Sequence, residues 1–170
     1  MKPFRARIRM LLPPPLLLVL FLLFDLGTSG PNMLDLHRLM DRPVLSATAL
    51  VTGGLSLYLV ISGLLRLVCN HTTINALHPA RTTTLITDGC YAFSRNPVYL
   101  GFVGIQLSVA MLSGSPLGLL ISPLLMGLIT LLHIQPEEEE IARRFGEQWK
   151  RYREQTPRWL TWRLRFGCSR

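Results

Sequence analysis

The amino-acid sequence predicts an all-α integral membrane protein, a helical bundle of about four transmembrane helices with a helical hairpin and a C-terminal amphipathic cytoplasmic helix. Three observations lead to this fold class. Hydrophobic residues make up 49% of the 170 residues and charged residues only 16%, which is too apolar for an ordinary soluble domain. Long apolar segments recur along the chain, and basic residues cluster at their ends. This length predicts a single domain, residues 1–170.

The first apolar segment, Met10 to Leu26, is interrupted near its start by Pro13-Pro14-Pro15. Prolines are tolerated in the first turn of a helix, so a short helix can begin there. A basic N-terminus followed by a short apolar run is also typical of a signal peptide, but "GTSG" is a poor cleavage site. We expect a retained short helix, with a cleaved segment as the alternative.

The second apolar segment, Val44 to Cys69, is about 26 residues long and can cross a ~30 Å hydrocarbon core with some tilt. Its glycines, including Gly53 and Gly63, permit close contacts between helices. Arg66 lies near its end, where a long basic side chain can reach the interface. We therefore expect a transmembrane helix here.

The third apolar segment, Val98 to Ile134, is too long for one crossing and carries "SGSP" at Ser113 to Pro116. These residues favour a turn. The segment therefore predicts a hairpin of two antiparallel helices, about Val98 to Leu112 and Leu117 to Ile134.

A C-terminal helix is predicted after the hairpin. Pro136 can occupy its first turn, where the acidic residues that follow are also favoured. Apolar residues then recur at helical spacings of four, four and three, at Ile141, Phe145, Trp149 and Tyr152. Such an amphipathic helix would lie in the cytoplasmic interface or cover the inner end of the bundle.

The distribution of basic residues predicts the orientation in the membrane bilayer. With four spans, both termini and the connector before the hairpin lie on the side that carries most of the lysines and arginines. Both termini and the polar stretch Thr84 to Gly101 should therefore face the cytoplasm. Basic clusters can also bind nucleic acid, but here they flank apolar spans, so we expect no nucleic-acid partner.

Several common site signatures are absent from the sequence. It contains no GxxxxGK[ST], no GxSxG and no HExxH, which argues against soluble nucleotide-binding and hydrolase sites. The three cysteines show no CxxC, and nothing near His71 or His78 completes a ligand set. We expect no metal site.

Polar and aromatic residues gather immediately before and at the start of the predicted hairpin, in "TLITDGCYAFSRNPVYLG". The hairpin should return Glu137 and Glu138 to the membrane surface where Arg95 to Tyr99 lie. Alone, the acidic run is more often a solvated helix start, and "RNPVY" could be an interfacial anchor. Together they predict a ligand site in which aromatic rings, an arginine, an amide and carboxylates converge.

The two motifs "LITDGCYAFSRNPVYLG" and "EEEEIARRFGEQWKRYREQTPRWL" resemble the isoprenylcysteine carboxyl methyltransferase and phospholipid methyltransferase superfamily of integral membrane methyltransferases. The resemblance covers roughly residues 83–160. It implies anchor spans and a connector in residues 1–83 and a cofactor-binding half in residues 84–160. It also implies S-adenosylmethionine bound at the cytoplasmic end of the bundle, without a Rossmann domain.

Carried over residue by residue, the resemblance implies cofactor contacts from the segment before the hairpin, the start of the hairpin and the glutamate pair: Thr84, Leu85, Ile86, Tyr91, Arg95, Asn96, Pro97, Val98, Tyr99, Glu137 and Glu138. Asn96 replaces the family's usual histidine; an amide donates and accepts hydrogen bonds but does not titrate. His133 stands where eukaryotic prenylcysteine enzymes carry an arginine implicated in substrate binding. The resemblance thus implies a substrate contact at His133 and weighs against a prenylcysteine substrate.

Residue chemistry agrees with this reading. Tyrosine rings supply stacking area and a polar hydroxyl for an adenosyl group, and aromatic faces with carboxylates favour a sulfonium. Methyl transfer is a single displacement that depends on positioning more than on a nucleophilic residue. A carboxylate or thiolate acceptor needs no base, whereas an amine must lose a proton. The sequence assigns no catalytic residue to that step.

We therefore expect a membrane-embedded methyltransferase that uses S-adenosylmethionine, with a lipophilic or small carboxylate, thiol or amine acceptor. A nicotinamide-dependent membrane reductase is one alternative, because sterol reductases share a similar Arg-His-Pro-x-Tyr element, although they are much larger bundles. A non-catalytic membrane adaptor is another, because Asn96 departs from the family pattern. Cofactor preference distinguishes the three.

Overall fold

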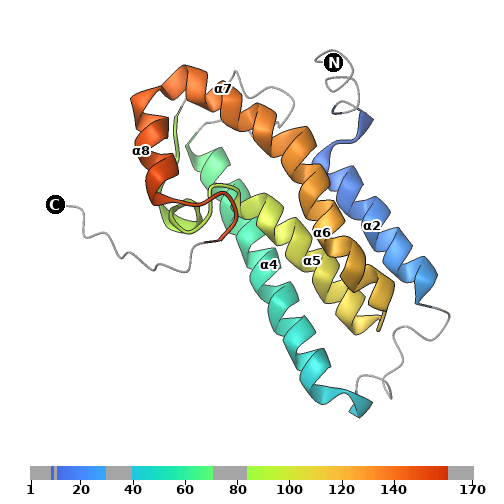
Figure 1. The fold of residues 1–170 in the computed structure, drawn as a ribbon. Helices are drawn as coiled ribbons and strands as arrows, with labels where there is room; N and C mark the ends of the chain where they lie inside the picture. Colours follow the sequence, from blue (N-terminus) through green and yellow to red (C-terminus); the bar gives the residue numbers. More distant parts are fainter. Residues whose placement is uncertain (1–8, 10, 30–39, 71–83, 161–170) are drawn as a thin grey trace.

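The computed structural model describes residues 9, 11–29, 40–70 and 84–160, which fold into helices and contain no β-strand (Figure 1). The all-α prediction is therefore confirmed for these residues. The connector histidines lie outside them, as do the parts of the predicted terminal basic clusters in residues 1–8 and 161–170. The elements in chain order are α2 (Pro14–Thr28), α4 (Pro43–Cys69), the 3₁₀ turn η2 (Gly89–Ala92), α5 (Pro97–Leu112), α6 (Pro116–Ile129), the π-helical turn η3 (Thr130–Ile134), α7 (Gln135–Phe145) and α8 (Glu147–Gln155).

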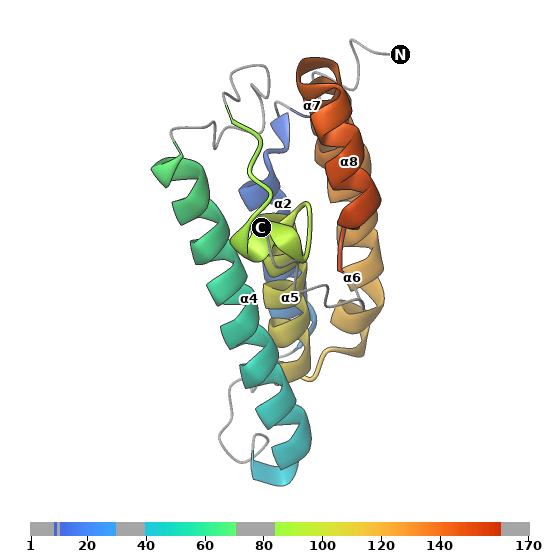
Figure 2. The same ribbon diagram turned by 90° about the vertical axis from the view of Figure 1, so that its left-hand side faces the viewer.

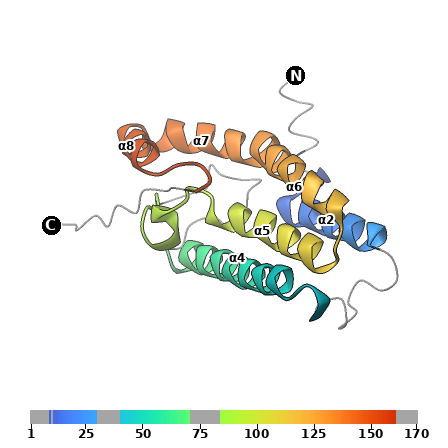
Figure 3. The same ribbon diagram turned by 60° about the horizontal axis from the view of Figure 1, so that its bottom comes forward.

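Helix α5 is the centre of the bundle. It packs against α4, α6 and α2, and α2 also packs against α6 (Figures 1 and 2). Seen from below, α4 lies on one side of α5, with α2 and α6 on the other (Figure 3). The segment between η2 and α5, together with α7 and α8, occupies one end of the bundle.

Among the described residues, two helices are long and apolar enough to cross a membrane: α4 and the continuous helix Pro116–Phe145 formed by α6, η3 and α7. The other two, α2 and α5, are shorter apolar helices. Helix α4 exposes a row of large apolar side chains, among them Leu50, Leu55 and Ile61. An exposed apolar surface of this kind is unfavourable in water and fits a lipid environment.

Small residues allow α4 and α5 to approach closely. A side chain added at Gly101 would meet the backbone oxygen of Ser56 and the side chain of Val60, and one at Gly104 would meet the Ser56 side chain. Farther along, the Ser108 hydroxyl donates to the Ala49 carbonyl at 2.7 Å. Such contacts are typical of helix pairs in membranes and fix the register of α5 on α4.

A buried polar cluster joins α2 to the hairpin at the opposite end from α7 and α8. The Gln106 amide donates to Asp25 Oδ2 at 2.9 Å and to the Gly118 carbonyl at 3.0 Å. Its oxygen accepts from the Ser122 hydroxyl at 2.6 Å. Both Asp25 and Gln106 are fully buried. The amide, on α5, is thus oriented by partners on two other helices, α2 and α6, and α2 is tied to the hairpin by more than apolar contact.

The chain after the hairpin differs from the single amphipathic helix that the sequence predicts. Helix α7 continues α6 through η3, and the helix then stops at Gly146, whose φ is +48°. A residue with positive φ cannot continue a right-handed helix, and glycine adopts it at little cost. The second helix, α8, turns aside and buries Trp149 and Tyr152. This break directs the following residues back toward the start of α5.

We predict that Asp25→Ala lowers the stability of the bundle, whereas Asp25→Asn leaves it nearly unchanged. Alanine leaves one buried Gln106 N–H without its partner, which costs about 1–3 kcal/mol, while asparagine keeps an accepting oxygen. Thermal unfolding in detergent, followed by circular dichroism, measures the difference. Asp41→Ala, at an exposed position, is the matched control. Equal stability of Asp25→Ala and wild type would contradict this view of the cluster.

Candidate functional site

The two predicted motifs meet at one end of the bundle, as the hairpin requires. Tyr99, in the first turn of α5, donates from its hydroxyl to Glu137 Oε1 at 2.8 Å. One turn earlier, Arg95 Nη2 lies 2.8 Å from Glu138 Oε1. Residues separated by some forty positions in sequence are therefore in direct contact, and each glutamate has its own partner.

Tyr99, Glu137 and His133 form one cluster, which we call the Tyr99 cluster. The Tyr99 and His133 rings lie 6.5 Å apart between centroids. The His133 side chain is fully buried, and its Nε2 lies 2.9 Å from the Leu12 carbonyl oxygen. A carbonyl oxygen can only accept, so Nε2 carries the hydrogen and Nδ1 holds the lone pair. Nδ1 has no hydrogen-bond partner among the described residues.

Tyr91 lies on η2, next to this cluster. Its hydroxyl is 3.5 Å from the Gly63 carbonyl oxygen of α4, and its own carbonyl accepts from the Tyr152 hydroxyl at 2.7 Å. Burial raises the pKa of Tyr91, and the charges of Cys90 and Glu137 raise it further. Burial is also the main cause of the raised pKa of Tyr152. Both phenols therefore remain protonated and act as hydrogen-bond donors at neutral pH.

Glu138 is held by two guanidinium groups. Besides Arg95, Arg158 Nη2 lies 2.6 Å from Glu138 Oε2. The Arg95 guanidinium also stacks over the Trp149 ring, 5.3 Å from its centroid. Arg95 and Glu138 side chains are only 7% and 12% exposed, so this ion cluster is largely removed from water. Buried charges are tolerated when each is paired in this way.

The ion cluster holds residues 156–160, which we call the C-terminal strap, against the start of α5. Backbone carbonyls of the strap accept hydrogen bonds from three consecutive residues before the helix. These bonds are Ser94 Oγ to Arg158 O at 3.3 Å, Arg95 N to Pro157 O at 3.0 Å, Arg95 Nη1 to Thr156 O at 2.9 Å and Asn96 Nδ2 to Arg158 O at 3.1 Å. Trp159 then packs against the apolar core cluster, as Tyr99 and Leu12 also do.

This arrangement explains how Asn96 can stand where the resemblance implies a histidine. Its amide acts as a donor to the Arg158 carbonyl. Asparagine and a neutral histidine can both supply an N–H donor, so the contact requires no titrating group.

The remaining predicted residues face other parts of the molecule. Pro97 and Val98 pack against α4 at Gly63, where an added side chain would meet both of them. Thr84 is exposed, Leu85 half-buried and Ile86 buried, in irregular backbone before η2. In the structure, Tyr99, Glu137 and His133 thus lie close together. Arg95 and Asn96 contact the strap directly, and Glu138 contacts its Arg158. Pro97 and Val98 lie in the interface between α4 and α5.

Sequence reasoning did not identify the strap residues. Arg158 and Trp159 lie in "TPRWL", the end of the second motif that carries the resemblance, but the sequence analysis assigns them no site role. The strap binds mainly through backbone carbonyls, which leave no signature in side-chain patterns.

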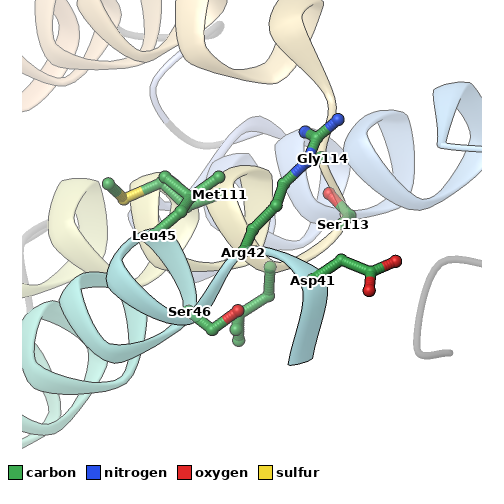
Figure 4. Close-up of a pocket in the computed structure, with 8 residues that line it drawn as sticks. Asp41, Arg42, Leu45, Ser46, Met111, Ser113 and Gly114 are labelled. Carbon is green, nitrogen blue, oxygen red and sulfur yellow. The ribbon is translucent and has the colours of Figure 1, made fainter. Parts of the chain in front are cut away.

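A hollow of about 350 Å³ lies at the other end of the bundle, between the start of α4 and the turn of the hairpin (Figure 4). It contains none of the predicted site residues, and its lining residues are Asp41, Arg42, Leu45, Ser46, Met111, Leu112, Ser113 and Gly114. It is therefore separate from the Tyr99 cluster.

Comparisons with known proteins find similarity to methyltransferases. A family model described as phospholipid methyltransferase matches residues 44–148, which include every predicted site residue. The Protein-S-isoprenylcysteine O-methyltransferase of Schizosaccharomyces pombe (strain 972 / ATCC 24843) is 34% identical over 73 residues. These residues are 43% of this chain and 31% of that relative, so the similarity spans less than a third of the relative's length. No solved structure matches the chain.

We predict that Asn96→His preserves the strap and that Asn96→Asp releases it. Histidine can donate to the Arg158 carbonyl, whereas aspartate places a carboxylate oxygen against it. Release should accelerate trypsin cleavage after Arg158, measured by mass spectrometry, several-fold over wild type. Asn70→Asp is the matched control, because the Asn70 amide donates to the Arg66 carbonyl at the end of α4, away from the strap. Equal cleavage of Asn96→Asp and wild type would show that this bond does not hold the strap.

Proposed function

The chain belongs to the phospholipid methyltransferase family, and on this premise we propose that it is a membrane-embedded methyltransferase. It transfers a methyl group from S-adenosylmethionine to a lipophilic or small carboxylate, thiol or amine acceptor. The observation that carries the proposal is the direct contact of Tyr99 with Glu137, since it unites the two motifs on which cofactor binding would depend.

The residues present suit this cofactor. S-adenosylmethionine supplies a methyl group on a positively charged sulfonium. Burial raises the pKa of Glu137 to about 7, so near neutral pH its carboxyl, which accepts a hydrogen bond from the Tyr99 phenol, is only partly ionised. A sulfonium bound beside it and the aromatic rings would favour its charged form. The unpartnered Nδ1 of buried His133 is a further polar group that a ligand in this cluster could satisfy.

We assign the predicted cofactor residues two kinds of role. Tyr91, Tyr99, Glu137 and the backbone of residues 84–86 would contact the cofactor, with His133 toward the acceptor. Arg95, Asn96 and Glu138 would act through the strap, which they hold over the start of α5. Pro97 and Val98 would fix the position of Tyr99 by packing α5 on α4.

The same placement supports a proposal for the arrangement in the membrane. We infer that α2, α4, α5 and α6 span the bilayer, with the Tyr99 cluster and both termini on the cytoplasmic side. A lipophilic acceptor would then enter from the bilayer, beside partly buried apolar residues of the bundle such as Leu12, Val103 and Trp159. The cofactor would enter from the aqueous side.

We predict that the detergent-purified protein binds S-adenosylmethionine in isothermal titration calorimetry and that Tyr99→Phe and Glu137→Gln each weaken binding. Each change removes part of a charge-assisted hydrogen bond or a charge. Such losses correspond to about tenfold to a hundredfold in Kd, from about 1.5–3 kcal/mol. Glu139→Gln is the matched control, because Glu139 is exposed on the same helix.

Titration with NADPH separates the alternatives. A folded wild type that binds NADPH and not S-adenosylmethionine would indicate a reductase, and one that binds neither would indicate an adaptor. Binding of S-adenosylmethionine that is unchanged in both site variants would place the cofactor elsewhere on the molecule.

A further inference from the structure

The 3₁₀ turn η2 depends on its neighbours for its position. It has four residues, and no side chain of the described residues caps its start. A helical turn this short is not stable on its own, so contacts with other elements must hold it in place. Yet η2 carries Tyr91 and follows the backbone of residues 84–86, which the proposed function assigns to the cofactor.

Helix α8 and the strap hold the second half of η2. The Tyr152 hydroxyl donates to the Tyr91 carbonyl at 2.7 Å, and Thr156 Oγ1 lies 3.5 Å from the Ala92 carbonyl oxygen. Both contacts reach the backbone of residues 91 and 92. The first half of η2, with the Asp88 that precedes it, is held by a different element.

That element is α4, against which η2 packs (Figure 2). Arg66 lies in the last turn of α4, and its Nη1 pairs with the Asp88 carboxylate. Gly89 has a φ of +61°, and a Cβ added to it would meet Nε, Cζ and Nη2 of Arg66. The guanidinium therefore binds Asp88 and lies directly against the backbone of Gly89. Glycine leaves room for this contact and adopts the positive φ at little cost.

The shape of the guanidinium matters more here than its charge. The Arg66 and Asp88 side chains are 40% and 68% exposed, so their ion pair alone contributes little to stability. A planar guanidinium can bind a carboxylate through one edge and pack against a peptide at the same time, whereas a lysine ammonium is a compact point charge. Either residue could reach the membrane interface from the end of α4. The contact with Gly89 is what arginine adds.

The end of α4 also holds Tyr91 and the start of α5. Three residues before Arg66, the Gly63 carbonyl oxygen lies 3.5 Å from the Tyr91 hydroxyl, and Gly63 packs closely against the first turn of α5. Residues three apart share one face of a helix. This face of α4 therefore sets the position of η2 relative to α5, the helix that carries Tyr99.

We propose that Arg66 is a positioning residue for the cofactor; the inference rests on the proposed methyltransferase function. By packing on Gly89, Arg66 fixes η2 against α4. It thereby sets where Tyr91 and the backbone of residues 84–86 stand relative to Tyr99 and Glu137. Arg66 acts through η2 and needs no contact with the cofactor itself.

The decisive variant is Arg66→Lys, which keeps the charge at the end of α4 and removes the planar group. In isothermal titration calorimetry of the detergent-purified full-length protein, it should bind S-adenosylmethionine about tenfold more weakly than wild type, the loss expected when one hydrogen-bonding contact is misplaced. Its thermal unfolding should stay close to that of wild type, because the ion pair is exposed. Arg143→Lys is the matched control, since Arg143 is an exposed arginine of α7 that also pairs with carboxylates; its affinity should lie within about twofold of wild type.

A double-mutant cycle tests the contact between Arg66 and Gly89. In the wild type, the methyl group of Gly89→Ala meets the guanidinium and should weaken cofactor binding. In an Arg66→Ala background the same space is free, so adding Gly89→Ala should cost less affinity than it does in the wild type. Losses that simply multiply would show that the two residues act independently, which would overturn the proposed contact.

A further readout does not depend on the cofactor. The chain has four tyrosines, so ¹⁹F NMR of protein labelled with 3-fluorotyrosine is simple, and the resonance of Tyr91 is identified by its absence from Tyr91→Phe. Without ligand, Arg66→Lys should shift this resonance and leave that of Tyr58, which is exposed on α4, unchanged. An arginine that served only as an interfacial anchor would shift neither resonance on replacement by lysine.

The outcomes of these measurements separate the two proposals. Failure of the folded wild type to bind S-adenosylmethionine would remove the proposed function and the positioning role with it. Wild-type binding together with equal affinity in Arg66→Lys, or with an unmoved Tyr91 resonance, would overturn the role of Arg66 and leave the methyltransferase proposal standing.

Discussion

The buried carboxylate of Glu138 is the constraint on which the site end of the molecule depends. It receives Arg95 from the segment before α5 and Arg158 from the strap, while Arg95 also stacks on Trp149 of α8. Removing Glu138 would leave the Arg95 guanidinium, whose side chain is only 7% exposed, without its ion-pair partner, which is far more costly than losing a surface ion pair. Three segments separated in sequence are therefore held in one arrangement, and Tyr99 is positioned within it.

Helix geometry gives the two adjacent glutamates different contact partners. Successive residues of an α-helix point about 100° apart, so Glu137 and Glu138 cannot face the same neighbour. Glu138 faces the guanidiniums and the strap, whereas Glu137 faces the phenol of Tyr99. A structural ion cluster and a candidate ligand group thus arise from consecutive residues.

The sequence was sufficient to predict the helical class, α4, the hairpin and the meeting of Tyr99 with Glu137. Apolar length and the "SGSP" turn carry that information locally. The break at Gly146 was not predicted, because the apolar stripe continues through it from Ile141 to Tyr152. The strap was missed because it accepts hydrogen bonds mainly through its own backbone carbonyls, and the roles of Arg95 and Asn96 as donors to it were missed for the same reason.

Polar anchors at both ends of α2 connect it to the rest of the bundle. At one end the Leu12 carbonyl holds His133, and at the other Asp25 binds Gln106. Between them Leu17 belongs to the apolar core with Leu125 and Ile129. Because an unpaired polar group is costly away from water, sliding or rotation of α2 would break both anchors at once. The tautomer of His133 therefore depends on the seating of α2, which makes this short helix part of the site as well as of the bundle.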